Sequence, residues 1–363
     1  MTPALECLEK FEAGEELTPS DAASLLRAEG PEEEALFAAA DRLRKELVGD
    51  KVSYVVNANL NFTNVCYTDC KFCGFWRRPA DEGAYTHPFS VLEEKLEKAR
   101  SWDVTEICMQ GGLNSNLSLD YYAKILELIH KKIPGVHIHA YSPAEIDHLQ
   151  RKTRLPLEEV ILTLKEAGLG SVPGTAAEIL CDEVKDIISP RRIRAGRWEE
   201  IIRCAHGLGL PSTSTIMIGH IETPEQVGRH LEVLRSIQKD TGGFTEFVPL
   251  PFVPYDNVLG RELGITEMVD NRYVFRVHAV SRLYFGAHIP NNQVSWPKIG
   301  LEASRRALQC GVNDLGGTLI EENISRSSGS RFGQYLTVEQ VRGAIEAEGR
   351  IPLERSTLYQ HIG

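Results

Sequence analysis

Residues 54–73 read YVVNANLNFTNVCYTDCKFC and pass from an apolar, strand-like run into a loop that carries three cysteines. These cysteines, Cys66, Cys70 and Cys73, are spaced C-x3-C-x2-C. An open, doubly wound sheet would carry a glycine-rich phosphate loop after its first strand, but no G-x-G-x-x-G follows this one. The stretch therefore favours a (β/α)8 TIM-type barrel, in which the loops after the strands meet on one face and build the active site.

The rest of the chain continues the alternation of short apolar segments with amphipathic ones. Segments such as 119–132 carry apolar residues at helical spacing. Strands that alternate with helices form a parallel sheet, and eight of them predict a closed barrel. The expected strands are 54–62, 104–110, 136–141, 169–172, 212–219, 244–250, 292–296 and 312–317.

Three parts of the chain are distinguished by their patterns. Residues 1–50 are expected to form an N-terminal helical cap, because 32–47 has apolar residues at helical spacing. Residues 51–320 are expected to form the barrel. Residues 321–363 are expected to form a C-terminal extension, with a helix followed by an irregular end from residue 350.

Composition excludes several classes of partner. The 363 residues carry a formal net charge of -11, whereas a surface that binds nucleic acid needs a basic excess. No apolar run reaches the roughly 20 residues that span a bilayer. The N-terminus is acidic and lacks the basic start and apolar core of a signal peptide. We therefore expect a cytoplasmic protein that binds neither nucleic acid nor membranes.

The cysteine cluster predicts a metal centre. Eight cysteines are present, and in a reducing compartment a cluster of three indicates metal binding rather than disulfides. A structural zinc site needs a fourth protein ligand, and the nearest histidine, His87, lies outside the usual zinc spacings. Three thiolates suit a 4Fe–4S cluster with one open iron, which implies chemistry. A non-catalytic iron–sulfur or zinc protein is the alternative.

The cysteine motif, with Phe72 directly before its last cysteine, resembles that of the radical S-adenosylmethionine (radical SAM) superfamily. The resemblance implies a 4Fe–4S cluster whose open iron binds the amino and carboxylate groups of S-adenosylmethionine. It also implies an external one-electron donor, because the reduced cluster cleaves S-adenosylmethionine to methionine and a 5'-deoxyadenosyl radical.

Further motifs follow the expected strands in the order that this superfamily shows. Gly111 and Gly112 resemble the glycine pair whose backbone receives the methionine amino group, where a side chain would block the ligand's approach. IMIGHIE at 216–222 resembles the motif that contacts adenine, and Glu178 resembles an acidic partner of the ribose hydroxyls. The residues that the resemblance assigns to the cofactor site are Phe72, Gln110, Gly111, Gly112, Ser142, Glu178, Gly219 and Glu222.

Longer segments, among them NQVSWPKIG at 292–300, resemble one clade of this superfamily. The clade holds two futalosine enzymes of menaquinone biosynthesis and the FO synthase subunit that joins tyrosine to a pyrimidine. TEFVPLPFV at 245–253 and PGTAAEIL at 173–180 favour the transferase type. Its substrates are L-tyrosine and 5-amino-6-(D-ribitylamino)uracil, and a second radical SAM enzyme then closes the deazaflavin ring. Dehypoxanthine futalosine cyclase and aminofutalosine synthase are the alternatives.

The resemblance implies that the radical takes a hydrogen atom from the tyrosine amino group. The Cα–Cβ bond then breaks, and the 4-hydroxybenzyl fragment joins the uracil. Glu246 is expected to contact substrate, unless strand parity turns it outward to pair with a helix cation. His139 is a candidate for proton transfer, although a core histidine is the more common outcome.

Polar residues in the late strands are candidates to recognise the uracil edge, although such residues more often cap helices or form turns. These candidates are Asn292, Gln293 and Asn313, with Asp314 as a catalytic carboxylate. Candidates for binding the tyrosine carboxylate, by charge and position, are Arg282, Lys298 and Arg326.

Overall fold

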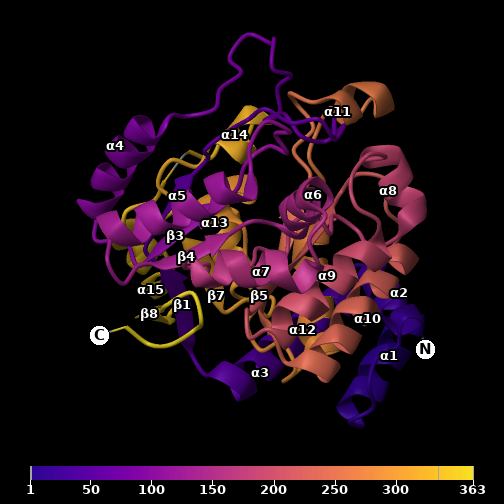
Figure 1. The fold of residues 1–363 in the computed structure, drawn as a ribbon. Coiled ribbons are helices and arrows are strands. Elements are labelled where there is room, and N and C mark those ends of the chain that lie inside the picture. Colours follow the sequence, from indigo (N-terminus) through magenta and orange to yellow (C-terminus); the bar gives the residue numbers. More distant parts are fainter. Residues whose placement is uncertain (1, 334, 363) are drawn as a thin grey trace.

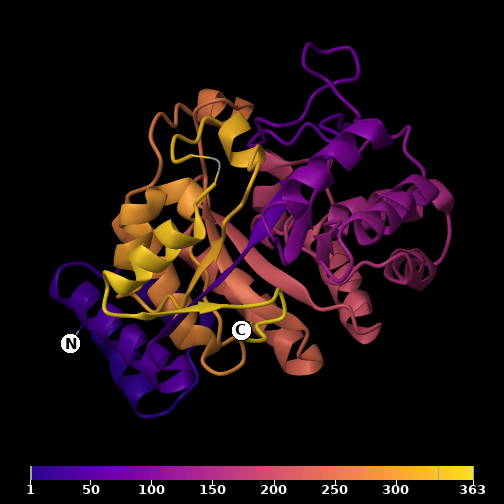
Figure 2. The same cartoon turned by 90° about the vertical axis from the view of Figure 1, so that its left-hand side faces the viewer.

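Short parallel strands lie at the centre of the molecule, and helices cover them (Figure 1; Figure 2). The computed structural model describes residues 2–333 and 335–362, so Met1, Gln334 and Gly363 lie outside the described residues. The strands are β1 (Lys51–Val55), β2 (Asn57–Leu60), β3 (Glu106–Met109), β4 (His137–Ala140), β5 (Ser212–Ile218), β6 (Phe244–Pro251), β7 (Asp314–Gly317) and β8 (Ile351–Glu354).

Parallel pairing links these strands in chain order. Continuous ladders join β2 to β3 and β4, β5 to β6, and β7 to β1. Single bridges connect these ladders. Residues 171–172 pair with β4 on one side and β5 on the other, and residues 292–293 pair with β6 and β7 in the same way. A last bridge joins Ala58 of β2 to Ile320. The predicted α/β alternation is confirmed, and two of the expected strands are reduced to bridge pairs.

Helices follow the strands along the chain. Most of the helices after β2 lie in the connections between successive strands. They are α4 (Phe89–Arg100), α5 (Leu119–Lys132), α6 (Pro143–Thr153), α7 (Leu157–Glu166), α8 (Asp182–Ile188), α9 (Ala195–Gly207), α10 (Pro224–Thr241), α11 (Val258–Leu263), α12 (Asn271–Phe285), α13 (Trp296–Ala307), α14 (Ile324–Ser327) and α15 (Val338–Glu346). Among the described residues, no helix combines the length and apolar character needed to cross a membrane.

Three helices precede β1, as the sequence predicts. They are α1 (Pro3–Glu12), α2 (Pro19–Leu26) and α3 (Pro31–Val48), and each has proline at its N-terminal end, where the missing N–H is not needed. A capping box between Thr18 and Asp21 begins α2. Helix α2 packs on α10 and α12, α3 packs on α12, and α1 packs on α2 and α3.

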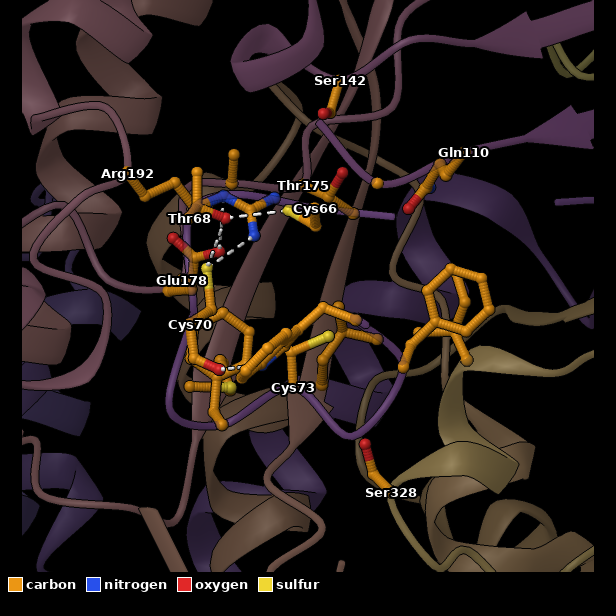
Figure 3. A pocket seen from close by; sticks show the side chains of 18 of the residues that line it. Cys66, Thr68, Cys70, Cys73, Gln110, Ser142, Thr175, Glu178, Arg192 and Ser328 are labelled. Atoms are coloured by element: carbon orange, nitrogen blue, oxygen red, sulfur yellow. Dashed lines mark hydrogen bonds and ion pairs between the residues drawn. The ribbon is translucent and has the colours of Figure 1, made fainter. Parts of the chain in front are cut away.

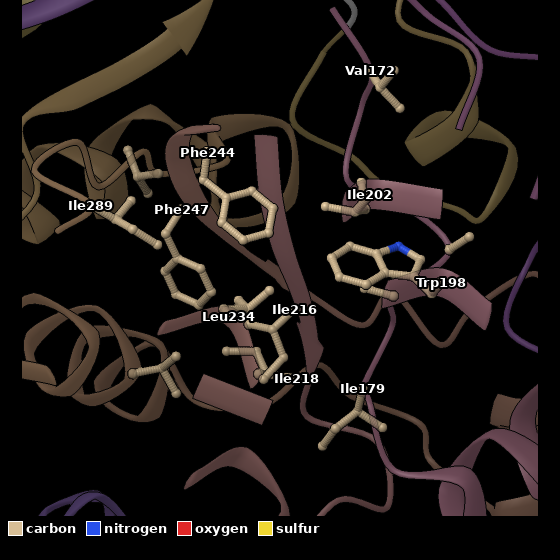
Figure 4. Close-up of a cluster of buried hydrophobic side chains, with 14 of the residues drawn as sticks. Val172, Ile179, Trp198, Ile202, Ile216, Ile218, Leu234, Phe244, Phe247 and Ile289 are labelled. Carbon is tan, nitrogen blue, oxygen red and sulfur yellow. The ribbon is translucent and has the colours of Figure 1, made fainter. Parts of the chain in front are cut away.

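Apolar side chains between β5, β6 and the helices α9 and α10 form part of the core (Figure 4). Ile216 and Ile218 of β5 and Leu234 of α10 are fully buried there. Trp198 of α9 is also fully buried, and its indole N–H donates to the carbonyl oxygen of Thr175 at 3.1 Å. The core thereby fixes the loop after residue 172, which lines the site described below.

The end of the chain differs from the expectation of an irregular segment. Strand β8 pairs in parallel with β1, from Lys51 with Ile351 to Tyr54 with Glu354. Strand β8 lies there because, of β1 and β2, only β2 pairs with β3, starting at Asn57. The preceding strand, β1, starts at residue 51 and has no β3 residues beside it. The first residues of β1 would otherwise leave an edge with unpaired N–H and C=O groups, and β8 covers that edge.

Candidate active site

The three clustered cysteines line one cavity of about 200 Å³ (Figure 3). They lie in the loop after β2, and the Thr68 hydroxyl stands 3.1 Å from Cys66 Sγ and 3.5 Å from Cys70 Sγ. The loop is held at several points. The Trp76 indole N–H donates to the Cys70 carbonyl at 3.2 Å, and the Cys66 N–H donates to the carbonyl of Arg77 at 3.0 Å. These bonds fix the thiols before any ligand binds.

The thiols meet the donor requirements of an iron–sulfur cluster. Burial raises the pKa of Cys70, and it raises the pKa of Cys73 to about 11, whereas the Arg192 guanidinium lies 3.4 Å from Cys70 Sγ and favours its thiolate. Within residues 2–333 and 335–362, no three His, Cys, Asp or Glu side chains are arranged to hold a metal ion. A four-iron cluster binds each thiolate at a different iron, so its ligands need not meet at one point.

Glu178 and Arg192 form a charged pair on the wall of this cavity (Figure 3). The Glu178 carboxylate lies 2.8 Å from Lys185 Nζ and 3.5 Å from Arg192 Nε. Burial opposes ionisation of Glu178, but Lys185 and Arg192 outweigh it and hold its pKa below the ordinary value. Glu178 also has a φ of 44°, an unusual conformation for a residue with a side chain. Sequence reasoning missed Arg192, whose only signal was a short basic run at 191–194.

The glycine pair lies where the cysteine loop crosses the end of β3. A Cβ on Gly112 would approach the carbonyl oxygen of Val65 to 2.3 Å, so a side chain does not fit there. The Gly111 N–H donates to Glu145 Oε1 at 3.1 Å, and the Ser142 hydroxyl donates to Glu145 Oε2 at 2.8 Å. Burial raises the pKa of Glu145 to about 7. Gln110, Gly111, Gly112, Ser142 and Phe72 all line the cavity, as does Glu145, which sequence reasoning missed.

The turn after β5 stands apart from the cavity lining. The Glu222 carboxylate accepts hydrogen bonds from the N–H groups of Gly219 at 2.5 Å and His220 at 2.9 Å. Gly219 has a φ of 82°, which favours glycine. The residue that reaches the cavity from this motif is Met217, whose N–H donates to the Glu178 carbonyl at 2.7 Å. Contact of Gly219 and Glu222 with a cofactor stays a prediction, and the structure places both in the turn that positions Met217.

A second cavity of about 240 Å³ adjoins the first and occupies the space among the strands. His139, Glu246 and Gln293 line it, as the sequence-based assignments require. The two cavities share wall residues, which are Gln110, Thr175, Thr215, Leu250, Lys298 and Ile324. We call the first space the thiol cavity and the second the inner chamber.

Glu246 points into the inner chamber, so the alternative of an outward-facing glutamate is wrong. Its Oε2 lies 3.2 Å from Arg355 Nη2 and accepts a hydrogen bond from the Tyr359 hydroxyl. Asp314 is fully buried beside it and accepts from Arg355 Nε at 2.5 Å and from the Ser53 hydroxyl at 2.6 Å. Asp314 does not line the chamber, and its contacts make it the residue that holds Arg355 in place.

The other predicted substrate residues divide between the chamber and the helix layer. His139 Nδ1 lies 2.7 Å from the Ser171 hydroxyl, and burial lowers the pKa of His139 to about 4, so the imidazole is neutral near pH 7. Asn292 Oδ1 lies 2.7 Å from His278 Nδ1, and Asn313 Oδ1 accepts from Arg282 at 2.6 Å. Both asparagines therefore bond to α12, and neither lines the chamber. The hydrogen bond to Asn313 also occupies the guanidinium of Arg282, which was a candidate for binding the tyrosine carboxylate.

Two family profiles match the chain. The profile described as "Radical SAM superfamily" matches residues 60–234, and that described as "CofH/MqnC C-terminal region" matches residues 241–362. The chain is 45% identical to 5-amino-6-(D-ribitylamino)uracil–L-tyrosine 4-hydroxyphenyl transferase 1 of Methanosarcina mazei, over 90% of this chain and 86% of that protein. The chain belongs to this transferase family of the radical SAM superfamily. The cofactors of the superfamily are a 4Fe–4S cluster and S-adenosylmethionine.

Other relatives of this transferase family agree. The transferase of Archaeoglobus fulgidus is 45% identical over 89% of this chain and 92% of that protein. The FO synthase of Streptomyces coelicolor is 45% identical over 94% of this chain, which spans only 40% of that longer protein. Among solved structures, methylornithine synthase PylB (16% identity, TM-score 0.74, 95% and 96% of the two chains) and HydG of Carboxydothermus hydrogenoformans (15%, TM-score 0.75, 98% and 80%) share the fold.

Three residues of the transferase's C-terminal segment reach the chamber region and were missed in the sequence. Arg355 and Thr357 line the chamber. Tyr359 does not line it, but its hydroxyl donates a hydrogen bond to Glu246. The Thr357 hydroxyl donates to Glu106 Oε2 at 2.7 Å. Their partners are far away in the sequence, so no local motif reveals them. The only signal in the sequence was a polar run, ERSTLYQ at 354–360, which is separated by four residues from an expected helix at 337–349.

The transferase should lose stability as Glu246 ionises. Burial raises the pKa of Glu246 from 4.5 to about 7, although Arg355 opposes the shift. The raised pKa favours the folded state fully below pH 4.5, and this contribution is lost as the pH rises through about 7. Between about pH 5 and pH 7.5, the free energy of unfolding of the wild type should fall by about 2 kcal/mol more than that of Glu246→Gln. Urea titrations at both pH values measure this, and parallel pH dependences would contradict it.

Proposed function

We propose that the protein transfers the 4-hydroxybenzyl group of L-tyrosine to 5-amino-6-(D-ribitylamino)uracil, a step of deazaflavin (FO) biosynthesis. The observation that carries the proposal is the 45% identity, over 90% of the chain, to a protein named for this transfer. The site supports it, because a cavity lined by three cysteines adjoins a second chamber among the strands that carries several polar side chains. A radical reaction needs a site from which water is kept away, since water and stray side chains would otherwise react.

The cofactors fit the thiol cavity by the chemistry of its donors. We assign the cluster to Cys66, Cys70 and Cys73, and we place S-adenosylmethionine against the backbone of Gly111 and the charged pair of Glu178 and Arg192. When bound, the two cofactors supply the 5'-deoxyadenosyl radical that removes a hydrogen atom from substrate. The buried hydroxyl of Thr175 has no hydrogen-bond partner among the described residues, as expected of a group that waits for a ligand.

The inner chamber supplies the groups for the two substrates. The Cα–Cβ bond of tyrosine breaks, and the remaining two carbons leave as a glycine imine. The benzyl radical adds to C5 of the uracil, and the adduct radical then loses one electron to a one-electron acceptor, and a proton, to give the coupled product. We assign the uracil edge to Gln293 and Glu246, because a protonated carboxyl near neutral pH presents both a donor and an acceptor. Neutral His139 is assigned a proton-transfer role. The Asn61 side-chain oxygen, which also faces the chamber, has no partner among the described residues.

The order of the parallel pairs supports an eight-stranded (β/α)8 barrel. From β2, parallel pairs run to β3 and β4, through the bridge at residues 171–172 to β5 and β6, and through the bridge at residues 292–293 to β7. Strand β7 then pairs with β1, which directly precedes β2 in the chain. We retain residues 1–50 as a helical cap, 51–320 as the barrel and 321–363 as the C-terminal extension. In this arrangement the extension also closes the end of the barrel at which β1 begins, through β8.

The proposal includes partners and a compartment. The radical chemistry needs an external one-electron donor, and the coupled product needs a second radical SAM enzyme to close the deazaflavin ring. The greater length of the Streptomyces coelicolor FO synthase, of which this chain spans 40%, supports such a second enzyme. Eight cysteines without a disulfide among the described residues support a reducing cytoplasm.

Anaerobic reconstitution with iron and sulfide tests the function. The reduced holoenzyme, given S-adenosylmethionine, tyrosine and 5-amino-6-(D-ribitylamino)uracil, should yield 5'-deoxyadenosine and a coupled adduct by mass spectrometry. Parallel incubations with futalosine-type substrates should yield neither. If 5'-deoxyadenosine formed only with a futalosine-type substrate, the alternative menaquinone enzymes would be correct. A colourless, zinc-bound protein would contradict the catalytic assignment.

A further inference from the structure

Among the described residues that line the site, Lys298 is a cation without a partner. Among the described residues that line the two cavities, the cations are Arg192, Arg355 and Lys298. Arg192 faces Glu178 and a cysteine, and Arg355 faces two carboxylates. The Lys298 ammonium has neither an ion pair nor a hydrogen bond with any described residue, yet Lys298 lines both cavities. An unpaired, partly buried ammonium is stabilised by an anion.

The fold directs Lys298 to this junction. It lies in the first turn of α13, which follows the bridge at residues 292–293. The indole N–H of Trp296 donates to the carbonyl oxygen of Gly317 at the end of β7, at 2.9 Å, and anchors this turn to the strands. Gly300 has a φ of 81° and breaks the helix directly afterwards. Lys298 is thus held on a short, anchored segment rather than on a free helix surface.

Glu322, the acidic residue whose charge most affects Lys298, already has other partners. Burial lowers the pKa of Lys298, and the charges of Glu322 and Cys73 oppose the shift. The Glu322 carboxylate already accepts the backbone N–H groups of Ser325 at 2.8 Å and Arg326 at 3.4 Å. Glu322 therefore caps α14, and the ammonium remains free for a ligand.

Resting on the proposed function, we propose that Lys298 binds the carboxylate of the substrate tyrosine at the junction of the two cavities. Two amino-acid carboxylates must enter this site, that of tyrosine and that of the methionine part of S-adenosylmethionine. Arg192 lines only the thiol cavity, next to Cys70, whereas Lys298 also lines the inner chamber. Of these two cations, Lys298 is therefore the one that can meet a carboxylate bound in the inner chamber. With its carboxylate at Lys298, the tyrosine lies where the two cavities meet and can reach into both.

Binding and kinetics of the holoenzyme test this assignment. Lys298→Met should weaken tyrosine binding about 10- to 100-fold, as expected when one charged hydrogen bond is lost. Equilibrium dialysis of labelled tyrosine into the unreduced holoenzyme measures this without turnover. The KM for tyrosine should rise by a similar factor, while the KM for the uracil and the affinity for S-adenosylmethionine stay at the wild-type values.

A substrate analogue isolates the carboxylate contact. Tyrosinamide lacks the negative charge, so the wild type should bind it about 10- to 100-fold more weakly than tyrosine. Lys298→Met should bind tyrosine and tyrosinamide alike, and Lys298→Arg should retain the discrimination. Lys131→Met, which removes an exposed lysine at the end of α5, is the matched control and should behave as wild type.

The outcomes separate this inference from the proposed function. If Lys298→Met still discriminated against tyrosinamide, or lost affinity for S-adenosylmethionine instead of tyrosine, the assignment would be overturned. If the wild type made no adduct from tyrosine and the uracil, the proposed function itself would fail. Retention of the iron–sulfur absorption by Lys298→Met shows that the variant is folded, and Lys298→Arg provides the test if it is not.

Discussion

Cys70→Ala is expected to leave a folded protein that has lost the absorption of its 4Fe–4S cluster and more than about 100-fold of its activity. Loss of a residue that merely supports a metal ligand already costs 10- to 100-fold, and Cys70 is assigned as a ligand itself. It is buried beside Arg192, whose guanidinium would then face no thiolate. Iron content and the visible spectrum after anaerobic reconstitution measure the first effect, and 5'-deoxyadenosine formation measures the second.

Cys204→Ala provides the matched control, because Cys204 lies half-buried in α9 and lines neither cavity. It should keep the full iron content and activity. A Cys70→Ala protein with an intact cluster spectrum and normal 5'-deoxyadenosine formation would show that Cys70 is not a ligand.

Arg355→Met is expected to destabilise the fold by about 3–5 kcal/mol, since removing one partner of a buried ion pair leaves charge without compensation. Its guanidinium is 3% exposed and lies 2.5 Å from Asp314 and 3.2 Å from Glu246. Urea titration of the holoenzyme measures the loss. The same variant should lower activity, because Arg355 also lines the inner chamber.

Two further variants make this expectation specific. Arg355→Met combined with Asp314→Asn should be more stable than Arg355→Met alone, because the uncompensated carboxylate is gone. Arg229→Met breaks an exposed pair with Glu183, both about half exposed, and should cost no more than about 1 kcal/mol. Equal losses for Arg229→Met and Arg355→Met would refute the role assigned to the buried pair.

The sequence predicted those parts of the fold and site that depend on local pattern. Alternation of apolar and amphipathic segments located the strands, including the weak ones at residues 171–172 and 292–293. The cysteine spacing, with the glycines after β3, located the thiol cavity. Such features can be predicted because the spacing of apolar residues and the spacing of motif residues are both contained in one short segment of sequence.

Long-range partners could not be predicted in the same way. Arg192 meets Cys70 from 122 residues away, and Arg355 meets Glu246 from 109 residues away. The direction of Glu246 depended on strand parity, which only the observed pairing decides. Asn292 and Asn313 lie at strand positions like those of chamber residues, but α12 presents His278 and Arg282 to them, and no local pattern in the sequence indicates that contact.

The position of β8 has a consequence for how the protein is made. Arg355 is synthesised 41 residues after Asp314 and 109 residues after Glu246, so both buried carboxylates are made well before their cation. Contacts between such distant segments form slowly, because a long loop must close first. Until β8 docks on β1, water can reach Asp314 and Glu246. The segment that carries β8 thus decides when the interior becomes dry enough to contain a radical.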